Sequence, residues 1–383
     1  INATLTADID LKRITPGLKI NGSFAYDVKN TFRKNFQKNW QYWSYDEITE
    51  LYTEHTMSYW SSPTLHEYNT RVNNWTANAN INYDRDFNGH HVTALLGYEQ
   101  HAYRRDYFTA GINSFASDII DEFFAGSADK SWYSINGNAK ETARLSFFGR
   151  VGYDYKSKYL FQFIARYDGS ENFAKGHRWG FFPGASAGWR ISEEPFIKDN
   201  APWIKNLKLR LSYGEQGNDQ IDPFQYMTTY EYATGVSYWM RIDNKDISSI
   251  VPGTIPNENV TWEVAKTWNV GLDGNIFNGM LSWELEYFNT RRSNILCPRN
   301  ASIPYYTGLT SNLPDENIGI VSNQGVEIQL SHENRVANGE FIYRINGNFL
   351  YAKNRVEFMD ETPWGEGHEY MNLTGHPMGA GLY

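Results

Sequence analysis

Hydrophobic and polar residues alternate along most of the chain. Near the start, Leu5, Ala7 and Ile9 occupy every second position, with threonine or aspartate between them. A period of two indicates a strand with one apolar and one polar face. Helical periodicity is scarce, and the pattern predicts about twelve strands of roughly nine to eleven residues. They fall in segments 4–12, 18–27, 75–84, 92–98, 144–155, 159–168, 183–191, 207–213, 262–274, 281–289, 326–332 and 341–351.

The connections between these segments alternate in length. Outer-membrane barrels place short turns on the periplasmic side and long loops outside, whereas the loops of a soluble sandwich vary without such order. The alternation therefore favours a barrel. The short turns are 15–17, 86–89, 156–158, 276–279 and 333–339, and the long connections are 29–71, 103–142, 215–261 and 291–322.

The strand dimensions also suit a membrane. A strand of about ten residues rises about 33 Å, and at a tilt of about 40° it covers an apolar band about 25 Å tall. Backbone groups in hydrocarbon have no water to bond, so strands there must close into a barrel. No run of about 18 apolar residues is present, which excludes a spanning α-helix. The fold class predicted is all-β, an antiparallel up-and-down transmembrane β-barrel.

Aromatic residues near the predicted strand ends distinguish this fold from a soluble sandwich, which would show the same alternation. Tyrosine and tryptophan suit the girdles where lipid meets water. The candidates are Tyr26, Trp75, Tyr83, Tyr98, Tyr155, Tyr159, Tyr167, Trp189, Tyr213, Trp262 and Tyr287.

Composition narrows the function classes. The 383 residues include 35 basic and 44 acidic ones, a formal net charge of −9, which argues against a general nucleic-acid partner. Aromatic residues make up 16%, yet the mean hydropathy is −0.60, as expected when apolar positions alternate with polar ones. The single cysteine, Cys297, excludes an internal disulfide framework and a multi-cysteine metal site.

Few short motifs point to chemistry. Gly184-Ala185-Ser186-Ala187-Gly188 matches the G-x-S-x-G pattern of serine hydrolases, which requires a strand, a sharp turn and a helix. Here the match falls inside a predicted strand. His-Glu pairs occur at residues 66, 332 and 368, but none has the second histidine of a helical zinc motif. We assign no catalytic residue, no metal and no cofactor, and we expect no enzyme.

The long connections are rich in aromatic residues. Flat aromatic faces could stack on sugar rings or peptide groups of a ligand, since long loops in an ordered domain tend to be functional. The alternative is that these side chains pack the loops into folded caps. The candidate ligand-binding residues are Trp40, Tyr42, Trp43, Tyr59, Trp60, Tyr238, Trp239, Tyr305 and Tyr306.

A series of motifs from about Leu145 onward resembles the SusC/RagA-type TonB-dependent outer-membrane transporters. Several motifs in the same order over a long stretch are more specific than any single one. They are Gly149-Arg150-Val151-Gly152-Tyr153, Arg166-Tyr167-Asp168-Gly169-Ser170, Phe173, Arg178-Trp179-Gly180, Phe182-Pro183, residues 188–194, residues 209–214, Gly217-Asn218, Trp262-Glu263, residues 267–271, Tyr287-Phe288-Asn289 and residues 323–327.

The resemblance implies a barrel of about 22 strands with a plug in its lumen, of which this chain supplies about half. We expect residues 1–383 to be a partial TonB-dependent receptor β-barrel domain, without the plug, the TonB-contacting segment and the terminal strands. The whole protein is expected in the outer membrane of a Gram-negative bacterium. It would import oligosaccharides or peptides, covered by a SusD-like surface lipoprotein and energised by the TonB complex.

The alternation also predicts which charged residues face the lumen. Reversing the faces would place them in lipid, at about 2 to 4 kcal/mol for each mid-bilayer Arg or Lys. The predicted lumen-facing residues are Arg144, Arg150, Arg166, Lys208, Arg210, Glu263, Asp273, Glu284, Glu286 and Arg344.

Two other functions stay open. One is a TonB-dependent siderophore or metal-chelate receptor, and the other is a soluble β-rich carbohydrate-binding protein or glycan hydrolase.

Overall fold

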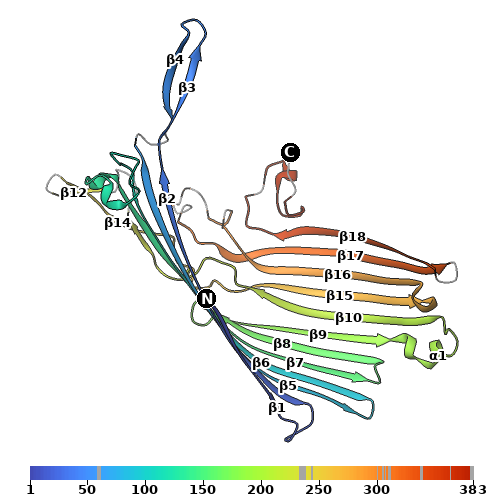
Figure 1. Ribbon diagram of the computed structural model, residues 1–383. Helices are drawn as coiled ribbons and strands as arrows, with labels where there is room; N and C mark the ends of the chain where they lie inside the picture. Colours follow the sequence, from blue (N-terminus) through green and yellow to red (C-terminus); the bar gives the residue numbers. More distant parts are fainter. Residues whose placement is uncertain are drawn as a thin grey trace. The chain divides into compact units, whose positions relative to one another are not determined.

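One sheet of twelve strands dominates the computed structural model (Figure 1), which confirms the predicted number. Residues 1–57, 62–232, 239–242, 245–299, 301–303, 306, 308, 312–336, 340–362 and 364–379 are described. The strands of the sheet are, in spatial order, β1 (Asn2–Asp10), β2 (Leu18–Gln37), β5 (Thr64–Phe87), β6 (His90–Ile112), β7 (Tyr133–Tyr155), β8 (Tyr159–Ser170), β9 (Trp179–Arg190), β10 (Ile204–Asn218), β15 (Glu263–Ile276), β16 (Leu281–Cys297), β17 (Glu316–Val336) and β18 (Phe341–Phe358).

The remaining elements are small. Across the described part of the chain, no helix is long and apolar enough to cross a membrane. The small elements are the strand pairs β3 (Trp40–Asp46) with β4 (Leu51–Met57), β11 (Tyr230–Tyr232) with β14 (Ile250–Pro252) and β12 (Trp239–Ile242) with β13 (Lys245–Ser248), and the helices η1 (Phe123–Ala125), η2 (Lys130–Trp132), η3 (Ile191–Glu193), α1 (Pro195–Lys198), η5 (Phe277–Gly279) and η8 (Glu369–Met371).

Except for β1, which has nine residues, the strands of the sheet are longer than the nine to eleven residues predicted. β5 has 24 residues, and β6 and β7 have 23 each. Both β5 and β7 begin well before their alternating segments, in sequence that is polar on both faces. Alternation arises only where one face is apolar, while backbone pairing continues wherever a neighbouring strand is present. Parts of the predicted long connections 29–71 and 103–142 are therefore strand.

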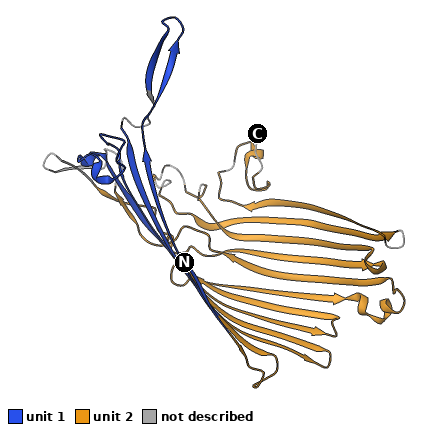
Figure 2. Ribbon diagram, viewed as in Figure 1, with its two compact units in different colours: residues 1–7, 23–77, 100–143 blue, residues 8–22, 78–99, 144–383 orange. Residues whose placement is uncertain are grey.

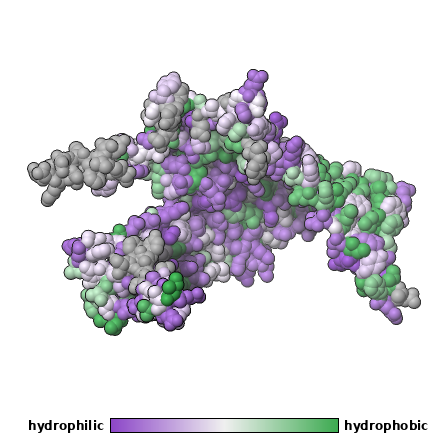
Figure 3. Space-filling model, turned by 90° about the horizontal axis from the view of Figure 1, so that it is seen from above, coloured by the Kyte–Doolittle hydropathy of each residue, from purple (hydrophilic) through white to green (hydrophobic). Residues whose placement is uncertain are grey.

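The register from β7 to β18 separates apolar from polar side chains. Register partners on neighbouring strands point to the same face. One row of partners is apolar and consists of Leu209, Leu272, Leu285, Ile328 and Phe349. The adjacent row is polar and consists of Lys208, Asp273, Glu284, Gln329 and Asn348. Figure 3 shows hydrophilic residues (purple) gathered together, apart from hydrophobic patches (green).

The apolar face carries large side chains that remain exposed. Phe349 is 58% exposed, Trp268 60% and Ile345 64%. In a soluble sandwich this face would be buried against a second sheet, whereas on a barrel wall it contacts lipid. The exposure therefore favours the barrel over the sandwich.

Shifts in the register lie near strand ends. Between β10 and β15 the shift falls at Ile204, near the start of β10. Between β16 and β17 it falls around Ile295, and between β17 and β18 at Ile320. The rows between these points pair without interruption.

The chain forms two compact units (Figure 2). The first comprises residues 1–7, 23–77 and 100–143. Its core consists of Leu65, Ile112 and Phe115, and the Phe115 ring contacts that of Phe36 edge-on at 5.4 Å. The second unit comprises residues 8–22, 78–99 and 144–383.

The core of the second unit consists of Phe173, Phe182, Val260 and Trp262. The Trp262 ring lies 5.2 Å from that of Phe173 and 5.3 Å from that of Phe182. Its indole Nε1 donates to the carbonyl oxygen of Arg178 at 3.1 Å. This core joins the β8–β9 and β10–β15 connections to the sheet. Trp262 is only 7% exposed, so its predicted place in an interfacial girdle is wrong.

Two glycines make room for the Phe182 ring. A Cβ atom on Gly217 would lie 2.0 Å from Phe182 Cζ, and one on Gly180 would lie 2.3 Å from the same atom. Because a side chain at either position would displace the ring, the core requires glycine at both.

A second group of contacts lies at the other end of these strands, around Glu194. Its Oε1 accepts from the Tyr159 hydroxyl at 2.6 Å and from Trp189 Nε1 at 3.0 Å. Its Oε2 accepts from Lys158 Nζ at 2.9 Å. These bonds, first of all that from Tyr159, lower the pKa of Glu194 to about 2. The carboxylate thus joins the β7–β8 turn to the β9–β10 connection.

Substituting Gly217→Ala in the full-length protein should lower the free energy of unfolding by about 1 to 3 kcal/mol, because the added methyl group overpacks the Phe182 site. Urea unfolding in detergent measures the change. Gly214→Ala on the same strand is the control, since a Cβ there meets no atom within 4 Å; it should change stability by less than about 0.5 kcal/mol. Equal effects of the two substitutions would contradict the packing argument.

Substituting Glu194→Gln should destabilise the protein near neutral pH and make little difference near pH 2. Because the pKa of Glu194 in the folded state lies below its ordinary value of 4.5, the ionised carboxylate stabilises the folded state above about pH 4.5. This stabilisation is lost as the pH falls to about 2. Urea midpoints across this pH range measure the effect, and Glu366→Gln, at an exposed position, is the control. A difference between wild type and Glu194→Gln that is constant with pH would sink this account.

Candidate functional site

The charged residues predicted to face the lumen all lie on the polar face of the sheet. The registers place Arg144, Arg150 and Arg166 on the same face as Lys208 and Arg210. The remaining residues of the set, Glu263, Asp273, Glu284, Glu286 and Arg344, follow on this face through the later pairings. That the polar face lines a lumen remains a prediction.

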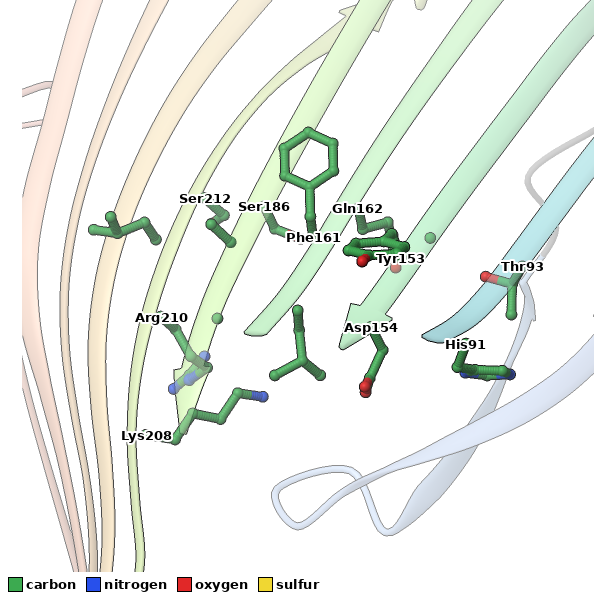
Figure 4. A pocket seen from close by; sticks show the side chains of 15 residues that line it. His91, Thr93, Tyr153, Asp154, Phe161, Gln162, Ser186, Lys208, Arg210 and Ser212 are labelled. Atoms are coloured by element: carbon green, nitrogen blue, oxygen red, sulfur yellow. The ribbon is translucent and has the colours of Figure 1, made fainter. Parts of the chain in front are cut away.

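A hollow of about 430 Å³ lies on this face (Figure 4). Lys208 and Arg210 reach it from β10, Asp154 from β7 and His91 from β6. The strands between them contribute small residues, among them Gly188, so the charged groups border open space. The arrangement can hold polar ligands or polypeptide by hydrogen bonds and charge.

Arg210 forms the densest ion-pair network of the polar face. Its Nε and Nη2 donate to Asp273 Oδ1 at 3.0 and 2.8 Å, and its Nη1 lies 3.4 Å from Glu286 Oε2. A Cβ on Gly271 would lie 2.9 Å from Nη2, so glycine lets the guanidinium cross β15. Glu284 lies beside this network as the register partner of Asp273.

Arg144 binds an aspartate that the sequence analysis did not single out. Its Nε and Nη2 donate to the two carboxylate oxygens of Asp219 at 2.8 and 2.5 Å. The Asp219 residue is 5% exposed, and its carbonyl oxygen accepts from Asn172 Nδ2 at 2.9 Å. The two-point pairing fixes the start of the β10–β15 connection, because bidentate arginine contacts restrict geometry. No short motif marks this pair, whose members are 75 residues apart.

Other members of the set have local partners. Arg166 donates to Asp168 Oδ1 at 2.9 Å and lies over the Phe148 ring at 5.1 Å. Glu263 lies 3.1 Å from Arg292 Nη1, and Arg344 Nε donates to Glu333 at 2.7 Å. Arg150 is exposed on β7.

The aromatic residues of the first long connection lie on a two-stranded hairpin, β3–β4. Trp40 is 59% exposed, Tyr42 42% and Trp43 58%. The rings of Trp40 and Tyr42 lie 6.0 Å apart, and Tyr42 stacks on His55 at 4.9 Å. The predicted alternative, that these aromatics pack into a buried cap, does not fit this exposure. Trp40 and Tyr42 lie on one face of the hairpin, and Trp43 lies on the other.

The other predicted loop aromatics are only partly described. Tyr59, Trp60, Tyr238 and Tyr305 lie outside the described residues, and Trp239 is described only as part of strand β12. Tyr306 is 88% exposed.

The motifs set aside in the sequence have structural places. Gly184 to Gly188 lie within β9, so the turn and helix that a serine nucleophile requires are missing. In the described ranges, no group of three or more His, Cys, Asp or Glu residues is placed to hold a metal ion.

Comparisons with known proteins agree with this architecture. The family model for the β-barrel of TonB dependent receptor-like proteins matches residues 4–381. TonB-dependent receptor P3 of Formosa agariphila is 30% identical over 299 residues, 76% of this chain and 28% of the relative. TonB-dependent receptor SusC of Bacteroides thetaiotaomicron is 28% identical over 291 residues, 74% of this chain and 27% of the relative.

A solved structure shares the fold. The RagAB peptide transporter superposes with a TM-score of 0.77 at 23% identity, over 93% of this chain and 36% of that one. The chain spans only 27–28% of the length of the two curated receptors. The predicted up-and-down β-barrel fold is confirmed, and the relatives are receptors by name. The chain belongs to the TonB-dependent receptor β-barrel family and lies in the outer membrane of a Gram-negative bacterium.

Proposed function

We propose that the whole protein is a TonB-dependent importer of oligosaccharides or peptides, and that residues 1–383 form part of its barrel wall. The observation that carries this proposal is the family match over residues 4–381. The similarity to SusC supports a nutrient importer rather than a siderophore or metal-chelate receptor. The match also argues against a soluble carbohydrate-binding protein or glycan hydrolase.

The wall would present its polar face to the lumen and its apolar face to lipid. The Arg210 network and the hollow beside it would then hydrate the lumen and hold a plug domain. β1 and β18 end the order of the sheet, and further strands must pair with them to close a barrel of about 22 strands. The plug, the TonB-contacting segment and these strands would lie outside residues 1–383.

The proposed partners follow from the same family. A SusD-like surface lipoprotein would cover the extracellular mouth, and the TonB complex would supply energy through the plug. The long connections lie at one end of the strands, where such a lipoprotein would dock.

Deleting the gene should abolish growth on one class of polymer-derived nutrient. Uptake of labelled oligosaccharide and peptide pools by wild-type, deletion and tonB-deficient cells identifies the class. We expect the deletion strain and the tonB-deficient strain to lose uptake of one of the two pools, and we expect the gene to restore uptake in the deletion strain. Unchanged uptake of both pools in the deletion strain would refute the proposal.

The hairpin aromatics offer a test of ligand capture. Substituting Trp40→Ala together with Tyr42→Ala should raise the half-saturating ligand concentration for uptake about 30-fold, because stacking on each of the two aromatic rings is worth about 1 kcal/mol. Ile48→Ala, on the same hairpin and 94% exposed, is the control and should leave uptake unchanged. Wild-type uptake by the double variant would exclude the hairpin from capture.

A further inference from the structure

A group of charged side chains crosses the apolar face of the sheet near the long connections. Glu215 on β10 pairs in register with Lys266 on β15, which pairs with Arg291 on β16. The same row continues through Ser322 on β17 to Arg355 on β18. Lys353 lies on the same face of β18, two residues before Arg355, and Glu357, at the register shift that follows, contacts Arg291. We call Glu215, Lys266, Arg291, Lys353, Arg355 and Glu357 the charged belt.

The rows beside the charged belt change character in a fixed order. Two residues nearer the short turns, Tyr213 and Trp268 are register partners with rings 4.4 Å apart, and their row continues through the polar Asn289 and Gln324 to Lys353. The next row is apolar and aromatic and consists of Leu211, Val270, Tyr287, Val326 and Tyr351. An apolar row, a row of aromatic and polar residues, and a charged row follow one another as hydrocarbon, interface and headgroups do across a leaflet. The belt therefore lies at headgroup level.

The long connections identify the leaflet. In outer-membrane barrels they lie on the extracellular side, so the charged belt faces the headgroups of the outer leaflet.

The charged belt holds more cations than its own acids neutralise. Lys266 and Arg291 are directly opposed, an arrangement that repels unless something negative lies between or beside them. Lys266 Nζ is 3.0 Å from Glu215, and Arg291 Nε is 2.8 Å from Glu357. Within the part of the chain that the structure describes, Lys353 and Arg355 form no ion pair and are exposed. Four cations against two carboxylates leave a formal charge of +2, in a chain whose net charge is −9.

We propose that the charged belt binds the phosphate groups of a lipid in the outer leaflet. Arginine's forked donors match phosphate oxygens, and lysine adds a point charge. Strands about 4.8 Å apart place the cations of β15, β16 and β18 within the width of one phosphorylated glycolipid headgroup. The acyl chains of the same molecule would lie on the apolar rows beside it. One lipid molecule would thus contact both the charged belt and the apolar rows, which a soluble phosphate or an acidic protein would not.

The proposal can be tested by titrating phosphorylated lipid A into the full-length protein in neutral detergent and counting bound lipid by native mass spectrometry. Lys353→Gln together with Arg355→Gln removes two unpaired cations and should weaken binding about 30-fold, which corresponds to about 1 kcal/mol per charge. Glu357→Gln removes an acid and should tighten binding. Lipid A without phosphates should bind wild type weakly.

The matched control is Arg292→Gln, which removes a cation next to Arg291 but on the opposite face, where Arg292 pairs with Glu263. It should leave lipid binding unchanged. Folding of each variant is checked by heat-modifiable migration on gels. Three outcomes would overturn the proposal: binding of the double variant within twofold of wild type, equal binding of lipid A without phosphates, or displacement of the lipid by inorganic phosphate at equal concentration.

Discussion

The structure depends on one requirement, that every backbone N–H and C=O group inside hydrocarbon be bonded to another strand. A continuous ladder meets it, and the ladder in turn fixes the register. Once the register is fixed, side chains at odd and even positions are committed to opposite faces. One face therefore carries the Lys208–Asp273–Glu284 row, and the other carries the adjoining Leu209–Leu272–Leu285 row. A change in register would therefore alter the polar face and the lipid-facing surface together.

A second feature is that residues distant in sequence meet at one aromatic core. Phe173, Phe182 and Trp262 come from three separate motifs of the family resemblance, and Gly180 and Gly217 come from two further ones. Their joint role is packing: the glycines leave the space that Phe182 fills, and Trp262 closes it from the next connection. These motifs thus mark how loops attach to the wall rather than a ligand site.

The sequence alone predicted the number of strands and their faces well, because alternation is imposed locally by lipid on one side. It placed strand ends poorly, as β5 shows, since pairing beyond the membrane leaves no alternation in the chain. It also missed Asp219 as the partner of Arg144 and assigned Trp262 to an interface. Such contacts depend on which loops fold back onto the sheet, and no short-range pattern encodes that.

The placement of the register shifts bears on how such a chain can change in length. In the pairings from β7 to β18, the described irregularities lie at Ile204, around Ile295 and at Ile320, near strand ends. An extra residue absorbed there leaves the rows between them in phase. The same insertion in the middle of β16 would put the residues on one side of it out of phase and turn polar-face side chains there toward lipid. Insertions and deletions should therefore accumulate at the strand ends of related barrels, while the spans between keep a constant length.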